Sequence, residues 1–204
     1  MKKTILGMIL LGFLCTVQGA SDPHPTADER AKAVKLLVDS QQEFLEAVEN
    51  LSAAQWSYKP APNRWSVGDV AEHILLAEGL LFSAVQAALA AQPNPEWETK
   101  TAGKTEFLEK VLVDRTPKAQ APEQLQPSGK LTRAEIISRF KEVRANTLKF
   151  AQETNAPLKE HTLDHPAPAF GTLSAYQWLV YIPLHHRRHN QQIAEVKAAA
   201  DFPK

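Results

Sequence analysis

Cysteine is nearly absent from this sequence of 204 residues, and its scarcity limits the chemistry that the chain can carry out. The single cysteine, Cys15, lies in an N-terminal segment that we expect to be removed from the mature protein. A mature chain without cysteine has no disulfide bonds, no thiolate ligands and no cysteine nucleophile. Any metal site must therefore be built from histidine, aspartate or glutamate side chains.

An excess of charge of one sign is also lacking. The chain has 23 lysine and arginine residues and 23 aspartate and glutamate residues, so its formal charge is zero when the histidines are neutral. Nucleic acids and anionic membranes are bound through a basic face. The charge balance therefore argues against both kinds of partner.

The first 20 residues have the pattern of a secretory signal peptide. Two lysines precede an apolar run over residues 5–17 that is too short to span a bilayer, and the small residues Gly19 and Ala20 follow it. We expect residues 1–20 to be cleaved, which predicts an exported protein, periplasmic or extracellular, that no longer contacts the membrane. Lipidation of Cys15 and an uncleaved membrane anchor are the alternatives.

Four long amphipathic segments follow, without an internal repeat or the alternation typical of strands. Apolar residues recur at steps of three and four residues over residues 27–50, 67–91, 133–152 and 175–199. Ser66 and Thr132 are expected to cap the second and third segments, and Thr172 or Ser174 the fourth. The pattern predicts an all-α four-helix bundle over residues 27–200, a fold whose core commonly holds metal sites.

Two connections between these segments are long. Residues 96–131 contain a short helical pattern near 105–113 and a part rich in proline, glutamine and serine, and a connection of this length usually crosses a bundle end or lines a site. Residues 154–172 are expected to be irregular and partly extended. His161 and His165 lie there, either as solvated loop residues or at the mouth of a pocket.

Three of the seven histidines fall within five positions near the C-terminus. On a helix, His185 and His189 lie one turn apart on one face, Gln192 lies close to the same stripe, and His186 is turned away. Two imidazoles at this spacing suit a metal ion that takes further ligands from a neighbouring element. The alternative is an amphipathic helix that is rich in histidine and binds no metal.

His73 is the candidate for the third ligand, because it lies on the apolar side of the second helix. If the second and fourth helices are neighbours, His73 can meet the other two histidines. Three imidazoles leave a divalent metal with an open coordination position, which is the arrangement of catalytic rather than structural zinc sites. Considered by itself, His73 has another explanation, which is a core histidine that forms a hydrogen bond and binds no metal.

Two stretches resemble the signature sequences of a known family. Residues 63–74 contain a Trp-Ser pair followed, seven residues after the serine, by His73, and residues 185–193 contain His-x-x-x-His-x-x-Gln. Both are similar to the signatures of the DinB/YfiT-like superfamily of metalloenzymes. The resemblance implies an up-down-down-up four-helix bundle, often dimeric, with a divalent metal held by His73, His185 and His189; His186 does not match.

Two further residues are candidates for contact with the ligands. Gln192 could accept a hydrogen bond from a ligand imidazole or bind metal-bound water, with ordinary polar packing as the alternative. Asp69 lies one turn before His73 but is already explained as part of a helix cap. Glu72 and Glu78 point away from His73, so neither is expected to act as a general base, and the catalytic residues stay unidentified.

The resemblance also bears on function, because characterised relatives include enzymes that transfer or use low-molecular-weight thiols. Such thiols are chiefly cytosolic, so for an exported protein we expect water as the nucleophile. The resulting hypothesis is a metal-dependent enzyme of hydrolase or transferase type that acts on a small molecule, with zinc as the expected metal and nickel or iron as alternatives. The second hypothesis is a non-catalytic module that binds a metal or a small ligand.

Overall fold

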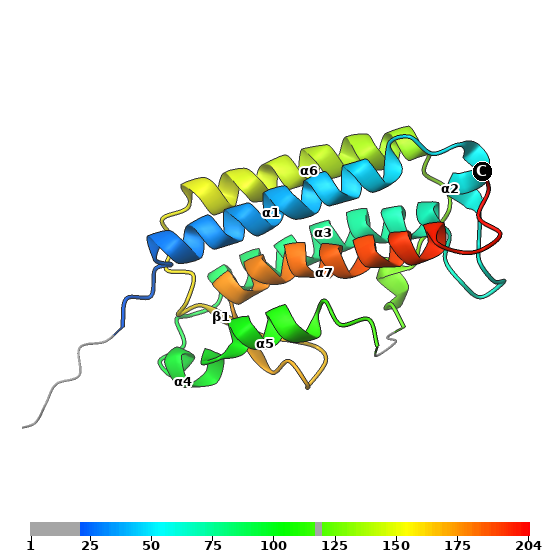
Figure 1. The fold of residues 1–204 in the computed structure, drawn as a ribbon. Helices are drawn as coiled ribbons and strands as arrows, with labels where there is room; N and C mark the ends of the chain where they lie inside the picture. Colours follow the sequence, from blue (N-terminus) through cyan, green and yellow to red (C-terminus); the bar gives the residue numbers. More distant parts are fainter. Residues whose placement is uncertain (1–20, 117–119) are drawn as a thin grey trace, which may run out of the picture.

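The computed structural model describes residues 21–116 and 120–204, which form a four-helix bundle (Figure 1). Its long helices are α1 (Ala27–Val48), α3 (Val67–Ala90), α6 (Arg133–Glu153) and α7 (Ala175–Lys197). Helices α1 and α3 each pack against both α6 and α7. In Figure 1, α1 and α7 run in one direction and α3 and α6 in the other, so the predicted all-α bundle with up-down-down-up topology is confirmed.

The predicted signal peptide at residues 1–20, with Cys15, lies outside the described residues. The remaining elements are short: α2 (Ala53–Ser57), α4 (Trp97–Thr101), α5 (Lys104–Val111), the 3-10 helix η1 (Glu123–Leu125), β1 (Thr162–Asp164) and β2 (Thr172–Ser174). The helix expected near 105–113 is present as α5, whereas α4 was not expected. Helix α5 packs against α7, so the long connection covers one side of that helix, as Figure 1 shows.

The segment expected to be irregular contains a small antiparallel sheet. Strands β1 and β2 pair with Leu163 opposite Leu173. Strands of three residues are too short to show an alternating pattern in the sequence, which explains why the pairing was not predicted. The pairing sets where the loop between the strands, with His165, lies relative to α7.

The helix starts follow directly from the sequence. All four long helices begin with a complete capping box, in which the cap side chain and the residue three positions later each bond the other's backbone N–H: Thr26 with Glu29, Ser66 with Asp69, Thr132 with Glu135, and Ser174 with Gln177. The caps predicted at residues 66 and 132 are confirmed, and Ser174 rather than Thr172 caps α7. These caps fix where each helix begins, and therefore which residues face the core.

The core consists of two apolar clusters. One contains Leu37, Val85 and Leu184, and the other contains Phe44 and Ile193, each with further buried residues. Between the two clusters, each long helix contributes a buried polar residue: Ser40 on α1, His73 and Glu78 on α3, Arg144 and Thr147 on α6, and His186 and His189 on α7. The middle of the bundle is therefore a polar layer enclosed by apolar residues.

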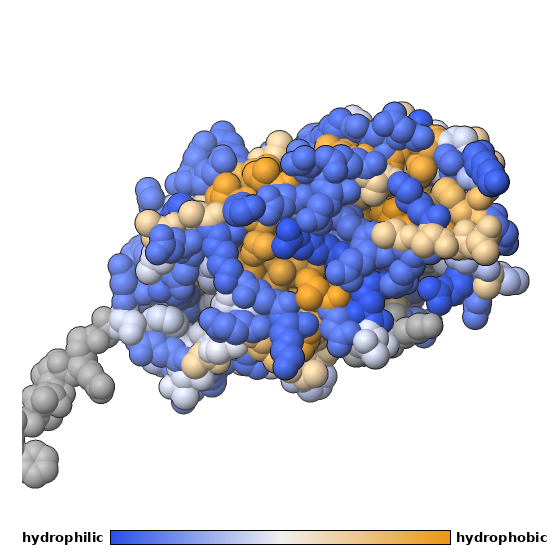
Figure 2. Space-filling view, viewed as in Figure 1, coloured by the Kyte–Doolittle hydropathy of each residue, from blue (hydrophilic) through white to orange (hydrophobic). Residues whose placement is uncertain are grey.

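Hydrophilic side chains cover most of the face shown in Figure 2.

Helix α3 is apolar and long enough to cross a membrane by composition alone. Its buried side nevertheless contains Glu72, His73 and Glu78. The Glu72 carboxylate accepts hydrogen bonds from the backbone N–H groups of Ser128 and Gly129 at 3.0 and 2.9 Å, so it ties the loop before α6 to the bundle. The apolar composition of α3 is accounted for by its packing against both α6 and α7.

Gly68, in the first turn of α3, allows the close approach of Trp56. A Cβ atom at this position would lie 2.5 Å from Nε1 and 2.8 Å from Cε2 of the Trp56 indole. The indole is rigid, so the contact cannot be relieved by moving a flexible chain end. The glycine in the Trp-Ser-Val-Gly-Asp sequence is therefore required by packing.

We predict that Gly68→Ala destabilises the protein by about 1–3 kcal/mol, because the added methyl group collides with Trp56. Gly79→Ala is the matched control, since Gly79 lies in the same helix and a Cβ there meets no atom within 4 Å. The control should stabilise the helix by about 0.5–1 kcal/mol. Urea unfolding of both variants measures the difference, and equal stabilities would contradict the packing role.

Candidate metal centre

Three histidines meet in the middle of the bundle. His73 of α3 and His185 and His189 of α7 each place a ring nitrogen within 4.8 Å of the other two. The ring centroid of His189 lies 4.4 Å from the ring centroid of His73 and 4.4 Å from the ring centroid of His185. The structure thus brings together the three residues that the sequence proposed as ligands, while the neighbouring His186 faces away, toward Arg144 and Glu78.

Hydrogen bonds determine which nitrogen of two rings carries the proton. Nδ1 of His73 lies 2.8 Å from the carbonyl oxygen of Leu125, which can only accept, so this nitrogen is protonated. Nδ1 of His189 lies 2.9 Å from Oε1 of Gln192. The same oxygen accepts from Nη1 of Arg115 at 3.3 Å, which fixes the orientation of the amide. In their neutral forms both rings therefore keep an unprotonated Nε2.

These two unprotonated nitrogens face each other. Nε2 of His73 lies 3.1 Å from Nε2 of His189. With no proton between them the two lone pairs repel, unless a cation lies beside both. A zinc ion at 2.0–2.1 Å from each ligand would hold two such nitrogens roughly 3.3 Å apart in tetrahedral geometry. The observed separation is close to that distance.

His185 supplies the third observation. Its Nδ1 is buried, and among the described residues it has no hydrogen-bond partner. Buried ring nitrogens are normally hydrogen-bonded, so this nitrogen has no acceptor or donor from the described part of the chain that would compete with a ligand. The three histidines therefore fit a divalent cation.

The protonation state of the site favours metal binding. Burial lowers the pKa of His73, and burial together with the neighbouring His73 lowers the pKa of His189 to about 3. Burial also lowers the pKa of His185 well below its ordinary value. All three rings are consequently neutral at pH 7, which is the form that coordinates metals. Among residues 21–116 and 120–204 no carboxylate joins the cluster, so a bound divalent ion would keep its full charge.

The three histidines differ in their exposure. His185 is partly exposed, whereas His73 is 2% and His189 9% exposed. On α7, the neighbours of His185 are the buried Tyr181 one turn before it and Arg188 one turn after it.

Aromatic rings pack together beside His185. The Tyr181 ring stacks with the His185 ring at a centroid distance of 6.2 Å, and His165 from the β1–β2 loop stacks on the other rings of this group, 5.5 Å from Tyr181 and 5.1 Å from Trp178. Burial raises the pKa of Tyr181 to about 12, so its hydroxyl keeps the proton at neutral pH. The sequence placed His165 in a solvated loop or at a pocket mouth; in the structure it is half-buried in the β1–β2 loop and stacks on Trp178 and Tyr181.

The two candidates for contact with the ligands differ in their positions. Gln192 holds His189, as the spacing on α7 suggested. The Asp69 carboxylate instead accepts from the backbone N–H of Ser66 at 2.9 Å and pairs with Lys59 at 2.8 Å. Burial opposes this charge, but the hydrogen bonds from Lys59 and Ser66 lower the pKa of Asp69. The contacts of Asp69 are those of a helix cap.

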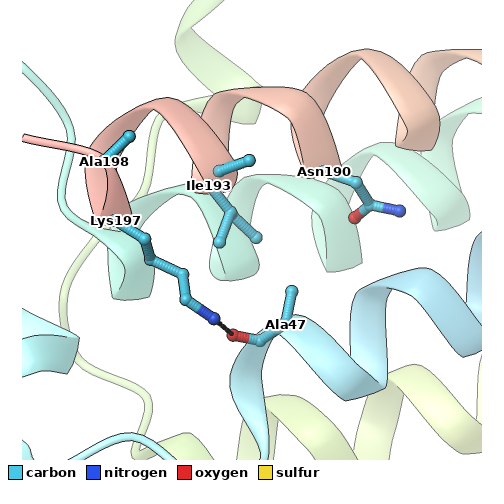
Figure 3. A pocket seen from close by; sticks show the side chains of 6 residues that line it. Ala47, Asn190, Ile193, Lys197 and Ala198 are labelled. Carbon is cyan, nitrogen blue, oxygen red and sulfur yellow. Dashed lines mark hydrogen bonds between the residues drawn. The ribbon is translucent and has the colours of Figure 1, made fainter.

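Two open depressions lie elsewhere on the surface. One, of about 340 Å³, lies along α7 beside the end of α1 and is lined by Ala47, Asn190, Ile193, Ala194, Lys197 and Ala198 (Figure 3). Across it the Lys197 ammonium donates to the Ala47 carbonyl at 3.2 Å. The other, of about 350 Å³, is lined by residues 146, 149, 150, 153 and 154 of α6 and its end. None of the three histidines lines either depression, so neither is a candidate for the chemistry.

Comparisons with known proteins agree with this arrangement. The family model of the DinB superfamily matches residues 36–193. The uncharacterized protein YuaE of Bacillus subtilis (strain 168) is 27% identical over 152 residues, which cover 74% of this chain and 88% of YuaE. The structure of YfiT from Bacillus subtilis, described as a probable metal-dependent hydrolase with an unusual four-helix bundle topology, superposes with a TM-score of 0.52 at 14% identity, covering 88% of this chain and 91% of YfiT. At this identity the likeness shows the fold alone.

We predict that His73→Ala or His189→Ala abolishes stoichiometric binding of zinc or nickel, because either change removes one of the facing nitrogens. His24→Ala is the control, since His24 is an exposed histidine that bonds only to Asp22 among its recorded side-chain contacts. Elemental analysis after equilibration with metal measures the stoichiometry. Full occupancy in either cluster variant would refute the assignment of the ligands.

We further predict that Gln192→Leu weakens zinc binding by about 10- to 100-fold, because the hydrogen bond that orients His189 is lost. The adjacent Gln191 is exposed, so Gln191→Leu serves as the control and should bind zinc as tightly as the unmodified protein. Competition with a chromophoric chelator measures both affinities. Equal affinities for the two variants would show that Gln192 plays no part in holding the ligand.

Proposed function

Because the chain belongs to the DinB superfamily and brings three histidines together in the middle of its bundle, we propose that it is a metal-dependent enzyme of hydrolase or transferase type. The observation that carries this proposal is the 3.1 Å separation of two unprotonated ring nitrogens, which a bound cation would stabilise. The description of YfiT as a probable metal-dependent hydrolase supports the choice of hydrolysis, since the two proteins share a fold.

Each side chain of the site has a distinct part in this proposal. The Leu125 carbonyl and the Gln192 amide hold the rings of His73 and His189, so that their Nε2 atoms stay unprotonated and aligned. When bound, the metal would supply Lewis-acid chemistry, activating water or polarising a carbonyl or phosphoryl group. The Tyr181 hydroxyl, which keeps its proton at neutral pH, would donate a hydrogen bond to a substrate that approaches His185.

Zinc is the metal that we propose. Three neutral imidazoles with one position left open are the ligand set of catalytic zinc, and nickel or iron would accept the same nitrogen donors. The signal-like pattern of residues 1–20 supports an enzyme that is exported to the periplasm or the extracellular space. In that location water is the available nucleophile, which favours hydrolysis of a small molecule over transfer of a cytosolic thiol.

A second function has one observation in its favour. Among the described residues no carboxylate joins the three histidines, and the nearby acids Glu72 and Glu78 are held by hydrogen bonds to other parts of the chain. A hydrolase usually has a general base close to the metal. A non-catalytic module that binds a metal or a small ligand is therefore the alternative to the enzyme.

The test is a hydrolysis screen of the purified, zinc-loaded protein with chromogenic esters, amides and phosphoesters. We expect hydrolysis of at least one class, with loss of activity after removal of zinc by a chelator, recovery on re-addition, and loss in His189→Ala. Tight zinc binding without hydrolysis of any class would instead favour the binding module. Activity that survives both the chelator and the substitution would contradict the metal-dependent mechanism.

A further inference from the structure

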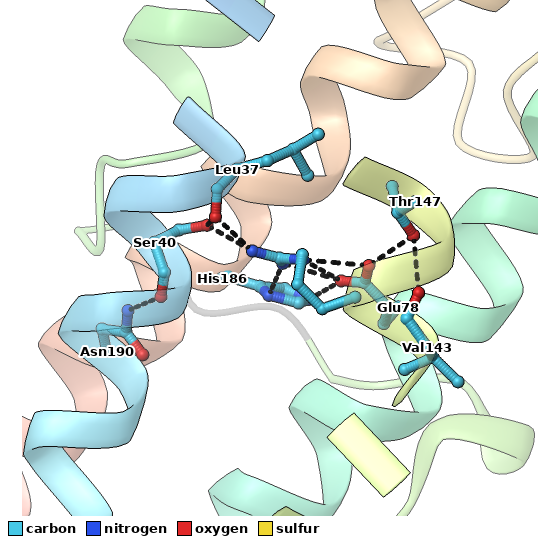
Figure 4. Close-up of polar contacts among 8 residues, drawn as sticks. Leu37, Ser40, Glu78, Val143, Thr147, His186 and Asn190 are labelled. Atoms are coloured by element: carbon cyan, nitrogen blue, oxygen red, sulfur yellow. Dashed lines mark hydrogen bonds and ion pairs between the residues drawn. The ribbon is translucent and has the colours of Figure 1, made fainter. Parts of the chain in front are cut away.

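A buried polar network joins all four long helices (Figure 4), and its member His186 is the neighbour of His185 in the sequence. At its centre is Arg144 of α6, whose side chain is fully buried. Its guanidinium donates to the Glu78 carboxylate of α3 through Nε at 3.1 Å and through Nη2 at 2.7 Å. Nη1 donates to the Leu37 carbonyl and the Ser40 hydroxyl of α1 at 2.6 and 3.0 Å. Nη2 also donates to Nδ1 of His186 on α7 at 2.6 Å. All five N–H donors of the arginine therefore have acceptors.

The network is balanced in charge, and the guanidinium at its centre is fully hydrogen-bonded. Glu78 balances Arg144, and the Thr147 hydroxyl donates to the same carboxylate at 2.7 Å. Because Nδ1 of His186 accepts a hydrogen bond from Arg144, the neutral ring carries its proton on Nε2, which lies 3.3 Å from Glu78 Oε2 without forming a hydrogen bond. A neutral His186 between a paired cation and anion needs no counter-ion from outside the network.

A buried network of this kind adds little to the free energy of unfolding. Burying an ion pair costs desolvation that its attraction often fails to exceed, and apolar residues of similar volume are frequently as stable. What the polar partners add is specificity of position, because each hydrogen bond is satisfied in only one arrangement of the helices. Purely apolar surfaces tolerate small rotations and shifts that would leave these donors without acceptors.

The network lies next to the ligands on both helices of the metal site. His186 is adjacent to His185 and three residues before His189 on α7, and it points into the core while they face α3. Glu78 follows His73 by five residues on α3, which corresponds to about 7.5 Å along the helix axis. The two helices that carry the ligands are therefore linked to each other through Arg144, close to the ligands.

We propose that Arg144 is a positioning residue of the metal centre. By holding His186 against Glu78, Ser40 and Leu37, it sets the rotation of α7 about its axis and its position along α3, and so makes His185 and His189 face His73. The inference rests on the proposed metal site. It adds that the geometry of the site depends on a side chain that does not touch the three histidines.

Arg144→Lys is the central test, since lysine keeps the charge but cannot reproduce the planar fork with five donors. We measure zinc affinity by chelator competition, the visible absorption spectrum of the cobalt-substituted protein, and the unfolding midpoint in urea. Zinc affinity should fall by about tenfold or more, and the cobalt spectrum should change because the ligands are displaced.

Two further variants keep the test decisive. Val85→Ala, at a buried position of α3 about three turns beyond His73, is the control. It should lower the unfolding midpoint while zinc affinity and the cobalt spectrum stay unchanged. The triple variant Glu78→Met/Arg144→Met/His186→Leu replaces the network by apolar side chains and is used if Arg144→Lys does not fold; it should fold with reduced zinc affinity and an altered cobalt spectrum.

The outcomes separate the two proposals. If Arg144→Lys or the triple variant folds and binds zinc with the affinity and cobalt spectrum of the unmodified protein, the positioning role is overturned while the metal site stands. If the unmodified protein itself binds neither zinc nor cobalt, the proposed metal-dependent function fails, and the positioning role fails with it.

Discussion

The contact on which the site depends is the approach of two ring nitrogens that have no proton between them. Nε2 of His73 and Nε2 of His189 lie 3.1 Å apart because the other nitrogen of each ring is committed to an oxygen, one from Leu125 and one from Gln192. A folded chain tolerates such a repulsive contact only when another interaction compensates for it. A divalent cation beside both nitrogens would provide that compensation.

The bundle holds this contact in a layer of polar side chains that crosses all four long helices. Apolar clusters on both sides of the layer supply most of the folding free energy through burial. The polar layer orients the helices relative to one another, because all five donors of Arg144 are satisfied in the observed arrangement. One of the acceptors is His186, which is next to His185 in the sequence. The apolar ends of the bundle thus provide stability, while the polar middle orients the helices that carry the three histidines.

Much of the fold and part of the site could be predicted from the sequence because the signals were local. The caps at Ser66 and Thr132 and the apolar periodicity define the long helices within a few residues, and the spacing of His185 and His189 places both on one face. His73 required a further assumption, that α3 and α7 are neighbours. The family resemblance supplied that assumption, and the structure satisfies it.

Features that depend on tertiary contacts could not be predicted. Arg144 and Glu78 are charged residues on amphipathic helices, and such residues are usually exposed, so their complete burial has no signal in a single sequence. The stacking of His165 on Tyr181 follows from the pairing of two three-residue strands, which are too short for a visible pattern. Both sets of contacts join residues that are distant in the sequence or lie on short elements, so they appear only in the folded chain.

The most direct test of the central claim is a crystal structure of the zinc-loaded protein with an anomalous difference map at the zinc absorption edge. We expect one strong peak at about 2.0–2.1 Å from a ring nitrogen of each of His73, His185 and His189. A map with no peak between these rings, in crystals of protein equilibrated with excess zinc, would contradict the account.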